Sequence, residues 1–271
     1  MTPTVQPTPV RAVVFDWGGT ITPWHAVDLR EQWAVFARGM GAIACSLNDT
    51  AAAVLRAEDD AWRRGREQGT SARLDEILVA AGLDPAHPAT EAGLAAYRDF
   101  WEPHTLTHPA IPPLWEWLRD NDIRVGVLSN TIWTRDYHRG IFERDGVLQL
   151  VDGDVYSSET PWVKPRREIF EAAAAAVGVE PAHCVYVGDR SYEDVHGPQS
   201  AGMRAVWIPH SDIPESQQVS HAATPDAIAH ELGDITDIVT AWQHGKPLPT
   251  RVRPDSVAGS AESAAGSVNG A

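Results

Sequence analysis

Short apolar runs alternate with helical stretches along most of this 271-residue sequence. Runs of this length, bounded by polar or turn-forming residues, are typical of strands buried inside a sheet. Because strands that alternate with helices form parallel sheets, we predict an α/β fold with a doubly wound parallel sheet. The expected strands cover residues 10–15, 123–128, 153–157, 184–187 and 205–208.

Helical patterns fill most of the intervals between these strands. Pro165 is expected at the first helical position of one helix, and Gly178 is expected to end it. Doubly wound sheets bind ligands beyond the carboxyl ends of their strands, so polar residues at those ends are the candidates for a site. The expected helices cover residues 114–120, 133–144, 165–177 and 226–242.

Residues 24–105 interrupt the alternation, because they contain helical patterns but no convincing strand. We predict a helical domain inserted after the first strand, with the core formed by residues 10–23 and 106–244. Its tryptophans are expected mainly in its own hydrophobic core, although one or two could line a substrate cleft. These are Trp24, Trp33, Trp62 and Trp101.

The two ends of the chain have a different composition. Residues 1–9 are rich in Pro and Thr, which predicts a flexible arm. Residues 245–271 hold few large apolar groups to offset the entropy of ordering, which predicts a disordered tail. The N-terminus lacks a secretory signal pattern, and no apolar run approaches the roughly 18 residues that cross a bilayer.

The charge balance argues against a nucleic-acid partner. The chain has 37 acidic and 22 basic residues and a formal net charge of −15. Nucleic-acid binding depends on a basic face, which this composition disfavours. Cys45 and Cys184 form no CxxC pair, so we expect two small buried side chains in a protein of the reducing cytoplasm. The sequence indicates neither a membrane partner nor an oligomeric state.

Two polar segments follow the first two main strands. Asp16 is followed by Gly18, Gly19 and Thr20, and the glycines allow backbone N–H groups to approach an anion. An Asp that caps a turn is the alternative. Ser129 and Asn130 follow the second strand, where a hydroxyl can donate to a phosphate oxygen or simply cap a helix.

Two further segments carry a cation and a pair of carboxylates. The chain has 20 arginines but only two lysines, and one of them, Lys164, precedes Pro165. A compact ammonium serves as a point charge where a planar guanidinium does not fit, although a solvated surface Lys remains the alternative. Asp189 and Asp194 follow a buried strand, and their oxygens suit Mg²⁺. Asp194 could instead cap a helix.

Taken together and in this order, these segments resemble the haloacid dehalogenase (HAD) superfamily of hydrolases. The matching pattern is Asp16-x-x-Gly19-Thr20, then Ser129, then Lys164-Pro165, then Gly188-Asp189 followed by Asp194. The resemblance extends over roughly residues 10–210. It implies a Rossmann-like core with an α-helical cap domain of the C1 type, inserted after the first motif.

The resemblance also implies roles for these residues. Asp16 would attack phosphorus and form an aspartyl phosphate, with Ser129 and Lys164 holding the phosphoryl oxygens. Gly19, Thr20 and Asn130 would complete the phosphate-binding loops. Mg²⁺ would bind Asp16, the Gly18 carbonyl, Asp189 and Asp194. The expected substrate is a small phosphorylated metabolite.

Gly18 departs from the family pattern, which has a second Asp that protonates the leaving group. Loss of such help typically costs about 10²–10⁴ in rate, so we expect low activity. His25 is the nearest candidate for a replacement acid. Phosphonate-cleaving members use a lysine in the cap domain, and residues 24–105 contain none.

Two other functions remain open. A 2-haloacid dehalogenase would have Tyr at the position of Gly18 and an arginine in the cap domain, for which Arg30 and Arg38 are candidates. A non-catalytic phosphate- or metabolite-binding protein on the same scaffold would need no acid at all.

Overall fold

The computed structural model describes residues 8–41, 44–209, 219 and 223–253. Its centre is a parallel sheet of six strands in the order β3-β2-β1-β4-β5-β6, which confirms the predicted fold class. The five expected strands are all present. The strands are β1 (Ala12–Phe15), β2 (Arg124–Ser129), β3 (Gly153–Tyr156), β4 (Cys184–Gly188), β5 (Arg204–Trp207) and β6 (Ala227–Ile228).

The residues of β1 alternate between two hydrophobic clusters, one on each face of the sheet. Val13 and Phe15 belong to the larger cluster, and Ala12 and Val14 to the smaller one. All four side chains are fully buried. Since β1 pairs with β2 on one side and β4 on the other, it is the central strand from which both layers of the core are built.

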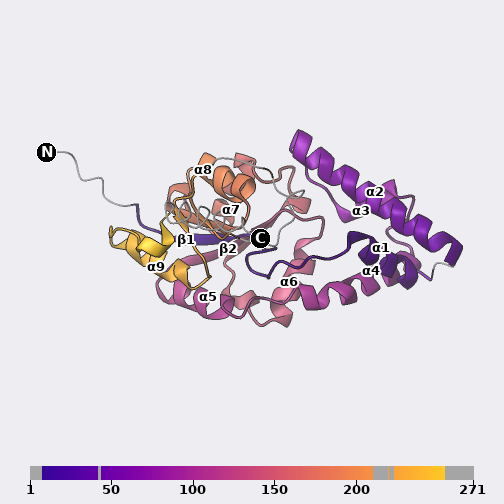
Figure 1. The fold of residues 1–271 in the computed structure, drawn as a ribbon, viewed down its shortest axis with the longest axis horizontal. Coiled ribbons are helices and arrows are strands. Elements are labelled where there is room, and N and C mark those ends of the chain that lie inside the picture. The colour runs from indigo at the N-terminus through magenta and orange to yellow at the C-terminus, as the bar shows by residue number, and fades with distance from the viewer. Residues whose placement is uncertain (1–7, 42–43, 210–218, 220–222, 254–271) are drawn as a thin grey trace, which may run out of the picture.

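Helices cover both faces of this sheet. On one face lie α7 (Arg167–Ala176) and the short α8 (Gly197–Ser200). On the other lie α5 (Ile111–Asp120), α6 (Arg135–Arg144) and α9 (Asp234–Gln243), as Figure 1 shows. No helix of the described residues is long and apolar enough to cross a membrane.

The chain between β1 and β2 forms a group of helices at one end of the molecule (Figure 1), which we call the helical insertion. They pack around Trp33, whose indole N–H donates to the buried Glu58 carboxylate at 2.7 Å. Trp62 and Trp101 join the same cluster as partly buried members, whereas Trp24 lies outside it. The helices are α1 (Leu29–Gly39), α2 (Ala44–Gln68), α3 (Leu74–Ala80) and α4 (Pro88–Trp101).

The loop after β2 contributes side chains to the hydrophobic cluster of the helical insertion. Ile132 is 4% exposed within that cluster, and Trp133 lies against Tyr97 of α4 with 5.2 Å between ring centroids. The Leu74 N–H, at the start of α3, also donates to the Ile132 carbonyl at 3.0 Å. The insertion is therefore attached to the core at this loop as well as at its two chain connections.

Three predicted helices begin later than expected, and α6 begins at Arg135, two residues after the expected start. α7 begins at Arg167, and Pro165 precedes it after a cis peptide bond with Lys164, while Gly178 ends the turn with φ of 66° as expected. The helix expected from residue 226 begins at Asp234, because Ala227 and Ile228 form β6 beside β5. A two-residue strand leaves no periodicity in the sequence, which explains the error.

The predicted tail is ordered in its first part. Residues 245–253 include a 3-10 turn over Thr250–Val252, and the fully buried Val252 joins the larger core cluster. Arg251 pairs with the carboxylate of Asp234 at 2.8 Å. The prediction of disorder is wrong for this stretch, because it was based on local composition and these contacts are made with residues distant in sequence. Residues 254–271, and residues 1–7 of the predicted arm, lie outside the described residues.

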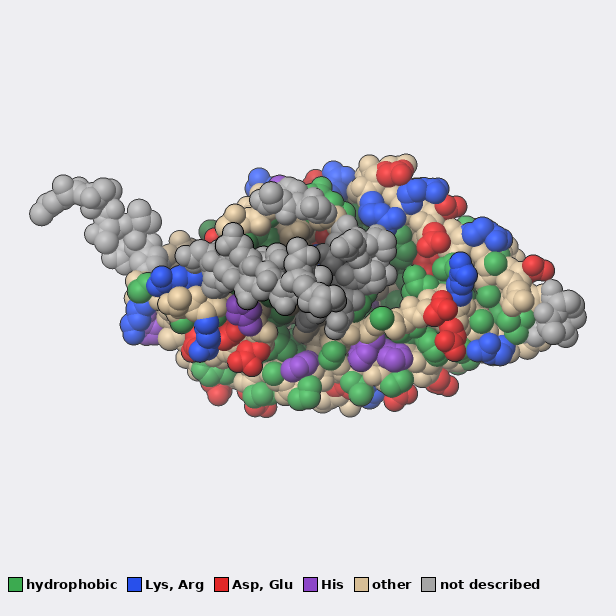
Figure 2. All heavy atoms as spheres, in the orientation of Figure 1, with side chains coloured by type: hydrophobic (Ala, Val, Ile, Leu, Met, Phe, Trp, Pro, Cys, Tyr) green, Lys and Arg blue, Asp and Glu red, His purple; other side chains and the backbone are tan. Residues whose placement is uncertain are grey.

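Charged side chains of both signs are interspersed on the face drawn in Figure 2. Blue Lys and Arg side chains lie among red Asp and Glu side chains over both the core and the helical insertion. The coloured part of this face therefore carries no continuous basic surface of the kind that a nucleic acid requires.

His138 on α6 is fully buried between two aromatic rings. It stacks on Tyr156 with 4.4 Å between centroids and meets Trp17 edge-on at 4.6 Å. Its Nε2 lies 3.1 Å from Thr131 Oγ1. Burial lowers the pKa of His138 to about 3, while the nearby Asp154 opposes that shift. The folded state therefore holds this imidazole neutral.

We predict that His138 makes the protein less stable in acid. Its pKa falls from 6.5 in the unfolded chain to about 3 on folding, so its stabilising contribution is complete above 6.5 and declines as the pH falls toward 3. Between pH 7.5 and pH 5 this amounts to about 2 kcal/mol of the free energy of unfolding. In urea titrations, His138→Phe should lose about that much of the wild-type pH dependence. His230→Gln, at an exposed position, should keep it; parallel wild-type and His138→Phe profiles would contradict the prediction.

Candidate functional site

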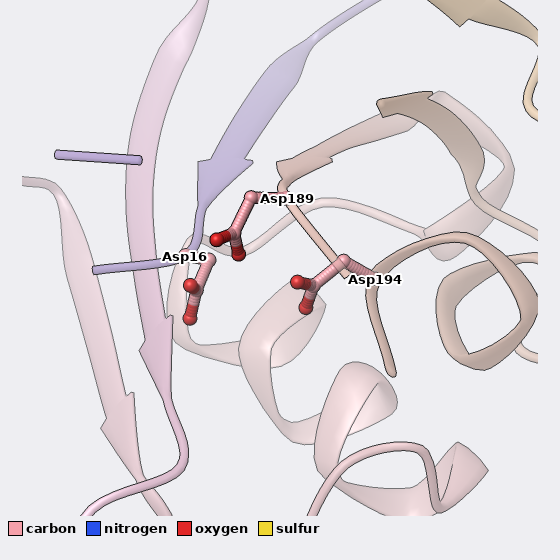
Figure 3. A group of neighbouring side chains, drawn as sticks. All are labelled: Asp16, Asp189 and Asp194. Atoms are coloured by element: carbon pink, nitrogen blue, oxygen red, sulfur yellow. The ribbon is translucent and has the colours of Figure 1, made fainter. Parts of the chain in front are cut away.

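Three carboxylates converge where the central strands of the sheet end. Asp16 follows β1, and Asp189 and Asp194 follow β4, which pairs with β1 in register so that both strands end at the same edge. Figure 3 shows the three side chains pointing toward one another. One oxygen of each lies within 4.8 Å of the others, and all three residues are at most 5% exposed.

Lys164 lies among these carboxylates and binds two of them. Its Nζ is 2.7 Å from Asp16 Oδ1 and 2.7 Å from Asp194 Oδ1. The lysine side chain is only 3% exposed, so these ion pairs are screened little by solvent. The structure thus brings together residues that are 148 and 30 positions apart in the sequence.

Asn130 and Tyr186 position this lysine. The side-chain amide of Asn130 accepts from the Lys164 N–H at 2.9 Å and donates to the Lys164 carbonyl at 3.2 Å. Lys164 Nζ also donates to the Tyr186 hydroxyl at 3.1 Å, and that hydroxyl donates to the Leu128 carbonyl at 3.2 Å. Both the backbone and the ammonium group of Lys164 are therefore held in place.

Burial dominates the ionisation of the site. It raises the pKa of Asp16, an effect that Lys164 opposes. It raises the pKa of Asp189 further, and the charges of Asp16 and Asp194 add to that rise. Burial alone would lower the pKa of Lys164, but Asp16 and Asp194 outweigh it and raise that pKa well above its usual range. The lysine stays charged, whereas burial disfavours the ionised forms of Asp16 and Asp189.

Asp189 is the carboxylate with the least support from the protein. Neither of its buried side-chain oxygens accepts a hydrogen bond from the described residues. Its position is nevertheless defined, because the Trp207 indole donates to its backbone carbonyl at 2.9 Å. A Cβ atom on Gly19 would collide with the Asp189 carboxylate, so the glycine allows this close approach.

The three carboxylates suit a hard divalent cation. An unpaired buried carboxylate is costly, and an ion with charge +2 would favour the ionised forms of Asp16 and Asp189 that burial disfavours. All the candidate ligand atoms are oxygens, as Mg²⁺ prefers. Asp16, Asp189 and Asp194 form the one group of at least three possible metal-ligating side chains within the described part of the chain.

The residues expected at the phosphate-binding loops differ in their burial and in their hydrogen-bond partners. Ser129 is the last residue of β2, the strand that pairs with β1, and is 3% exposed. The Thr20 hydroxyl is buried and forms no hydrogen bond with the described residues. The Gly19 N–H donates to the Thr22 carbonyl at 2.8 Å, and the Asn130 side-chain amide bonds to the backbone of Lys164.

Gly18 has open space beside it. A Cβ atom built on this residue would meet no atom within 4 Å, and its φ is not positive. His25, the expected replacement acid, is exposed and lies against His104, with 5.0 Å between the ring centroids. The ring contact that the structure shows for His25 is therefore with His104, and not with Asp16.

The sequence did not indicate two residues at this site. Tyr186 is one of the apolar residues of β4, and its polar role depends on Lys164, which is distant in sequence. Arg190 lies between Asp189 and Asp194 in the sequence and contacts Trp24, with 5.5 Å between Cζ and the indole ring. The only available signal for Arg190 was its place inside the last motif.

Comparison with known proteins identifies the family. The model of haloacid dehalogenase-like hydrolases matches residues 10–202, and a second model of HAD-like hydrolases matches residues 161–245. The chain belongs to the haloacid dehalogenase-like hydrolases. The resemblance stated from the four motif segments is thereby confirmed, and this hydrolase is an enzyme by family.

Relatives of this hydrolase include enzymes named for phosphate release. It is 28% identical to the glyceraldehyde 3-phosphate phosphatase of Methanopyrus kandleri over 61% of this chain and 70% of that protein. It is 24% identical to the ribulose-1,5-bisphosphate 5-phosphatase of Halopiger xanaduensis over 84% of this chain and 99% of the relative. A HAD phosphatase from Thermococcus onnurineus shares the fold, with a TM-score of 0.58 and 22% identity over 85% of this chain and 98% of that one.

We predict that Gly19→Ala weakens binding of a divalent cation. The new Cβ would push the Asp189 carboxylate away from Asp16, and φ of +88° adds backbone strain. Gly202→Ala is the matched control, since Gly202 has φ of +86° and open space around its Cβ position. Calorimetric titration with Mg²⁺ should show at least about tenfold weaker binding for Gly19→Ala only. Equal affinities in the two variants would contradict this reading of Gly19.

Proposed function

We propose that this hydrolase is a Mg²⁺-dependent phosphatase that acts on a small phosphorylated metabolite. The observation that carries the proposal is the contact of Lys164 with Asp16, beside two further carboxylates. A nucleophilic carboxylate, a fixed cation and a metal site within one buried cluster are the groups that phosphoryl transfer needs. The names of the relatives from Methanopyrus and Halopiger support the same reaction.

In this proposal Asp16 carries the phosphoryl group. Its Oδ2 attacks phosphorus while Oδ1 stays with Lys164, the bond to the leaving oxygen breaks, and an aspartyl phosphate forms. Water then attacks the same phosphorus, the bond to Asp16 breaks, and inorganic phosphate leaves. One proton of that water ends on the phosphate and the other on the alcohol, so the carboxylate is regenerated.

Asp16, Asp189, Asp194 and the Gly18 carbonyl would hold Mg²⁺. When bound, the ion supplies positive charge that offsets the charge of the phosphate and keeps Asp16 ionised. Lys164 and the Ser129 hydroxyl would bind phosphoryl oxygens, and Asn130 and Tyr186 would orient Lys164. The helical insertion would act as a cap domain that excludes water and selects the substrate.

Two alternative functions are a protein that binds phosphate without turnover and a 2-haloacid dehalogenase. Without a side chain at Gly18, the protein supplies no acid to the leaving oxygen at that position, which favours slow turnover or, as a second candidate, phosphate binding without turnover. A 2-haloacid dehalogenase is less compatible, because three carboxylates around one lysine would repel a carboxylate substrate unless a cation is bound.

Phosphate release tests the proposal directly. Wild-type protein should release phosphate from an aryl phosphate and from glyceraldehyde 3-phosphate with Mg²⁺, and EDTA should abolish the reaction. Asp16→Asn should reduce release to background, whereas Asp122→Asn, at an exposed position, should retain it. Binding of these esters without metal-dependent release would favour the non-catalytic alternative. Halide release from 2-haloacids without metal would establish the dehalogenase instead.

We predict that Gly18→Asp raises phosphatase turnover. The open space accepts the side chain, and its carboxyl group would protonate the leaving oxygen and then activate water. We expect at least about a tenfold higher kcat, since such groups contribute about 10²–10⁴. Gly233→Asp, which also adds an Asp where no atom lies within 4 Å, should leave kcat unchanged. A folded Gly18→Asp variant with an equal or lower kcat would contradict this account.

We predict opposite effects of Asp189→Asn in the absence and presence of metal. The metal-free variant should melt at a higher temperature than the wild type, because it loses a buried carboxylate whose pKa is raised by burial and by Asp16. Mg²⁺ at 100 times its Kd should stabilise the wild type by about 2.7 kcal/mol but have little effect on the variant. Thermal unfolding with Mg²⁺ or EDTA measures both, and a wild-type Tm that Mg²⁺ leaves unchanged would contradict the metal assignment.

A further inference from the structure

Two histidines from opposite ends of the helical insertion lie side by side. His25 is on the chain that leads from β1 into the insertion, and His104 ends the 3-10 turn that follows α4. Their ring centroids are 5.0 Å apart, and the two ring planes are tilted by 59°. The pair therefore lies where the two chain connections between the insertion and the core meet, although the two residues are far apart in the sequence.

The residues next to both histidines are attached to the core. Trp24 lies under the guanidinium of Arg190, on the loop after β4, at 5.5 Å. The carbonyl and the hydroxyl of Thr105 accept hydrogen bonds from Arg144 of α6 at 2.9 and 3.2 Å. The two backbone segments that carry the imidazoles are therefore held beside each other by the protein, which lowers the entropic cost of binding a ligand between them.

His104 is held in the neutral form that binds metal ions. Burial lowers the pKa of this imidazole, and the neighbouring His25 lowers it as well. Its Nδ1 is buried and forms no hydrogen bond with the described residues. A buried nitrogen without a partner is costly, so this atom requires a ligand that the described part of the chain does not supply. His25 is exposed, which gives an ion access to the pair from solvent.

The separation of the two rings fits one shared transition-metal ion. Zn–N bonds to histidine are about 2.0–2.1 Å long, so two imidazoles on one tetrahedral ion have centroids about 5 Å apart. Imidazole suits Zn²⁺, Cu²⁺ and Ni²⁺, whereas carboxylate oxygens suit Mg²⁺. The pair of imidazoles and the three carboxylates at the edge of the sheet therefore select different metals.

We propose that His25 and His104 bind one divalent transition-metal ion, such as Zn²⁺, which cross-links the two connections of the helical insertion. Water completes the coordination of the ion. A bound ion ties the first and last segments of the insertion together and restricts its movement relative to the core. The site is additional to the Mg²⁺ site and does not depend on phosphatase activity.

Pulsed EPR of Cu²⁺ identifies the ligands directly. Less than one equivalent of Cu²⁺ is added to the full chain in saturating Mg²⁺, and the wild type should show the modulation of two bound imidazoles. His25→Gln and His104→Gln should each remove one imidazole and weaken binding of Cu²⁺ and Zn²⁺ at least about tenfold, since loss of an outer-shell partner alone costs about 10–100-fold. His230→Gln, at another exposed position, should change neither property.

The spectra can also overturn the proposal. Cu²⁺ with oxygen ligands alone would do so, and so would an imidazole signal that is unchanged in His25→Gln. His104 packs against Phe100 and Trp101, with 6.1 and 5.8 Å between ring centroids, so its variant tests folding as well as binding. His25→Gln alters an exposed side chain and decides the question even if His104→Gln does not fold.

Hydrogen exchange tests the cross-link separately from binding. Zn²⁺ at 10 times its Kd should slow amide exchange in residues 23–28 and 102–107 of the wild type about tenfold, because the ion has to leave before the connections open. The same Zn²⁺ concentration should have no such effect on His25→Gln. Binding by both imidazoles with unchanged exchange would overturn the cross-link. Equal slowing in His25→Gln would place the effect of Zn²⁺ at another site and overturn it too.

Discussion

The site depends on the ion pairs of Lys164 with Asp16 and Asp194. One buried ammonium faces three carboxylates, and removal of one partner from a buried pair typically costs about 3–5 kcal/mol because the other charge is left unbalanced. The lysine comes from a loop outside the strands, so Asn130 has to hold its backbone and Tyr186 its ammonium group. These contacts are possible only because β1 lies between β2 and β4, which brings all the partners to one edge of the sheet.

Three glycines lie around this cluster, and the space beside their Cα atoms differs from one to the next. Gly19 has a positive φ and leaves room for Asp189, and a Cβ atom on Gly188 would collide with Asp194. Gly18 has neither constraint, because nothing occupies the space beside it. Packing therefore explains two of the glycines but not the third. The lack of an acid at Gly18 is a chemical property of this hydrolase and not a consequence of crowding.

The sequence predicted the sheet and the convergence of its motif residues well. Short apolar runs mark buried strands, and the carboxyl ends of neighbouring parallel strands meet, so Asp16, Ser129 and Asp189 were expected together. The strand over Ala227–Ile228 was missed because two residues show no periodicity. The order around Val252 was missed because it depends on contacts with the core, not on local composition. The role of Tyr186 was hidden for a similar reason, since an aromatic residue within an apolar strand looks like core.

The loop after Ser129 sets the limits of any exchange of the helical insertion between relatives. Ile132 and Trp133 are distant in sequence from residues 24–105, yet they complete the hydrophobic cluster of α1 to α4. A chimaera joined only at the two chain connections would leave the transplanted helices with a cavity and expose two apolar side chains of the recipient to water. The unit that can be exchanged without loss is therefore discontinuous, because it includes residues 132–133, which lie three and four positions beyond Ser129.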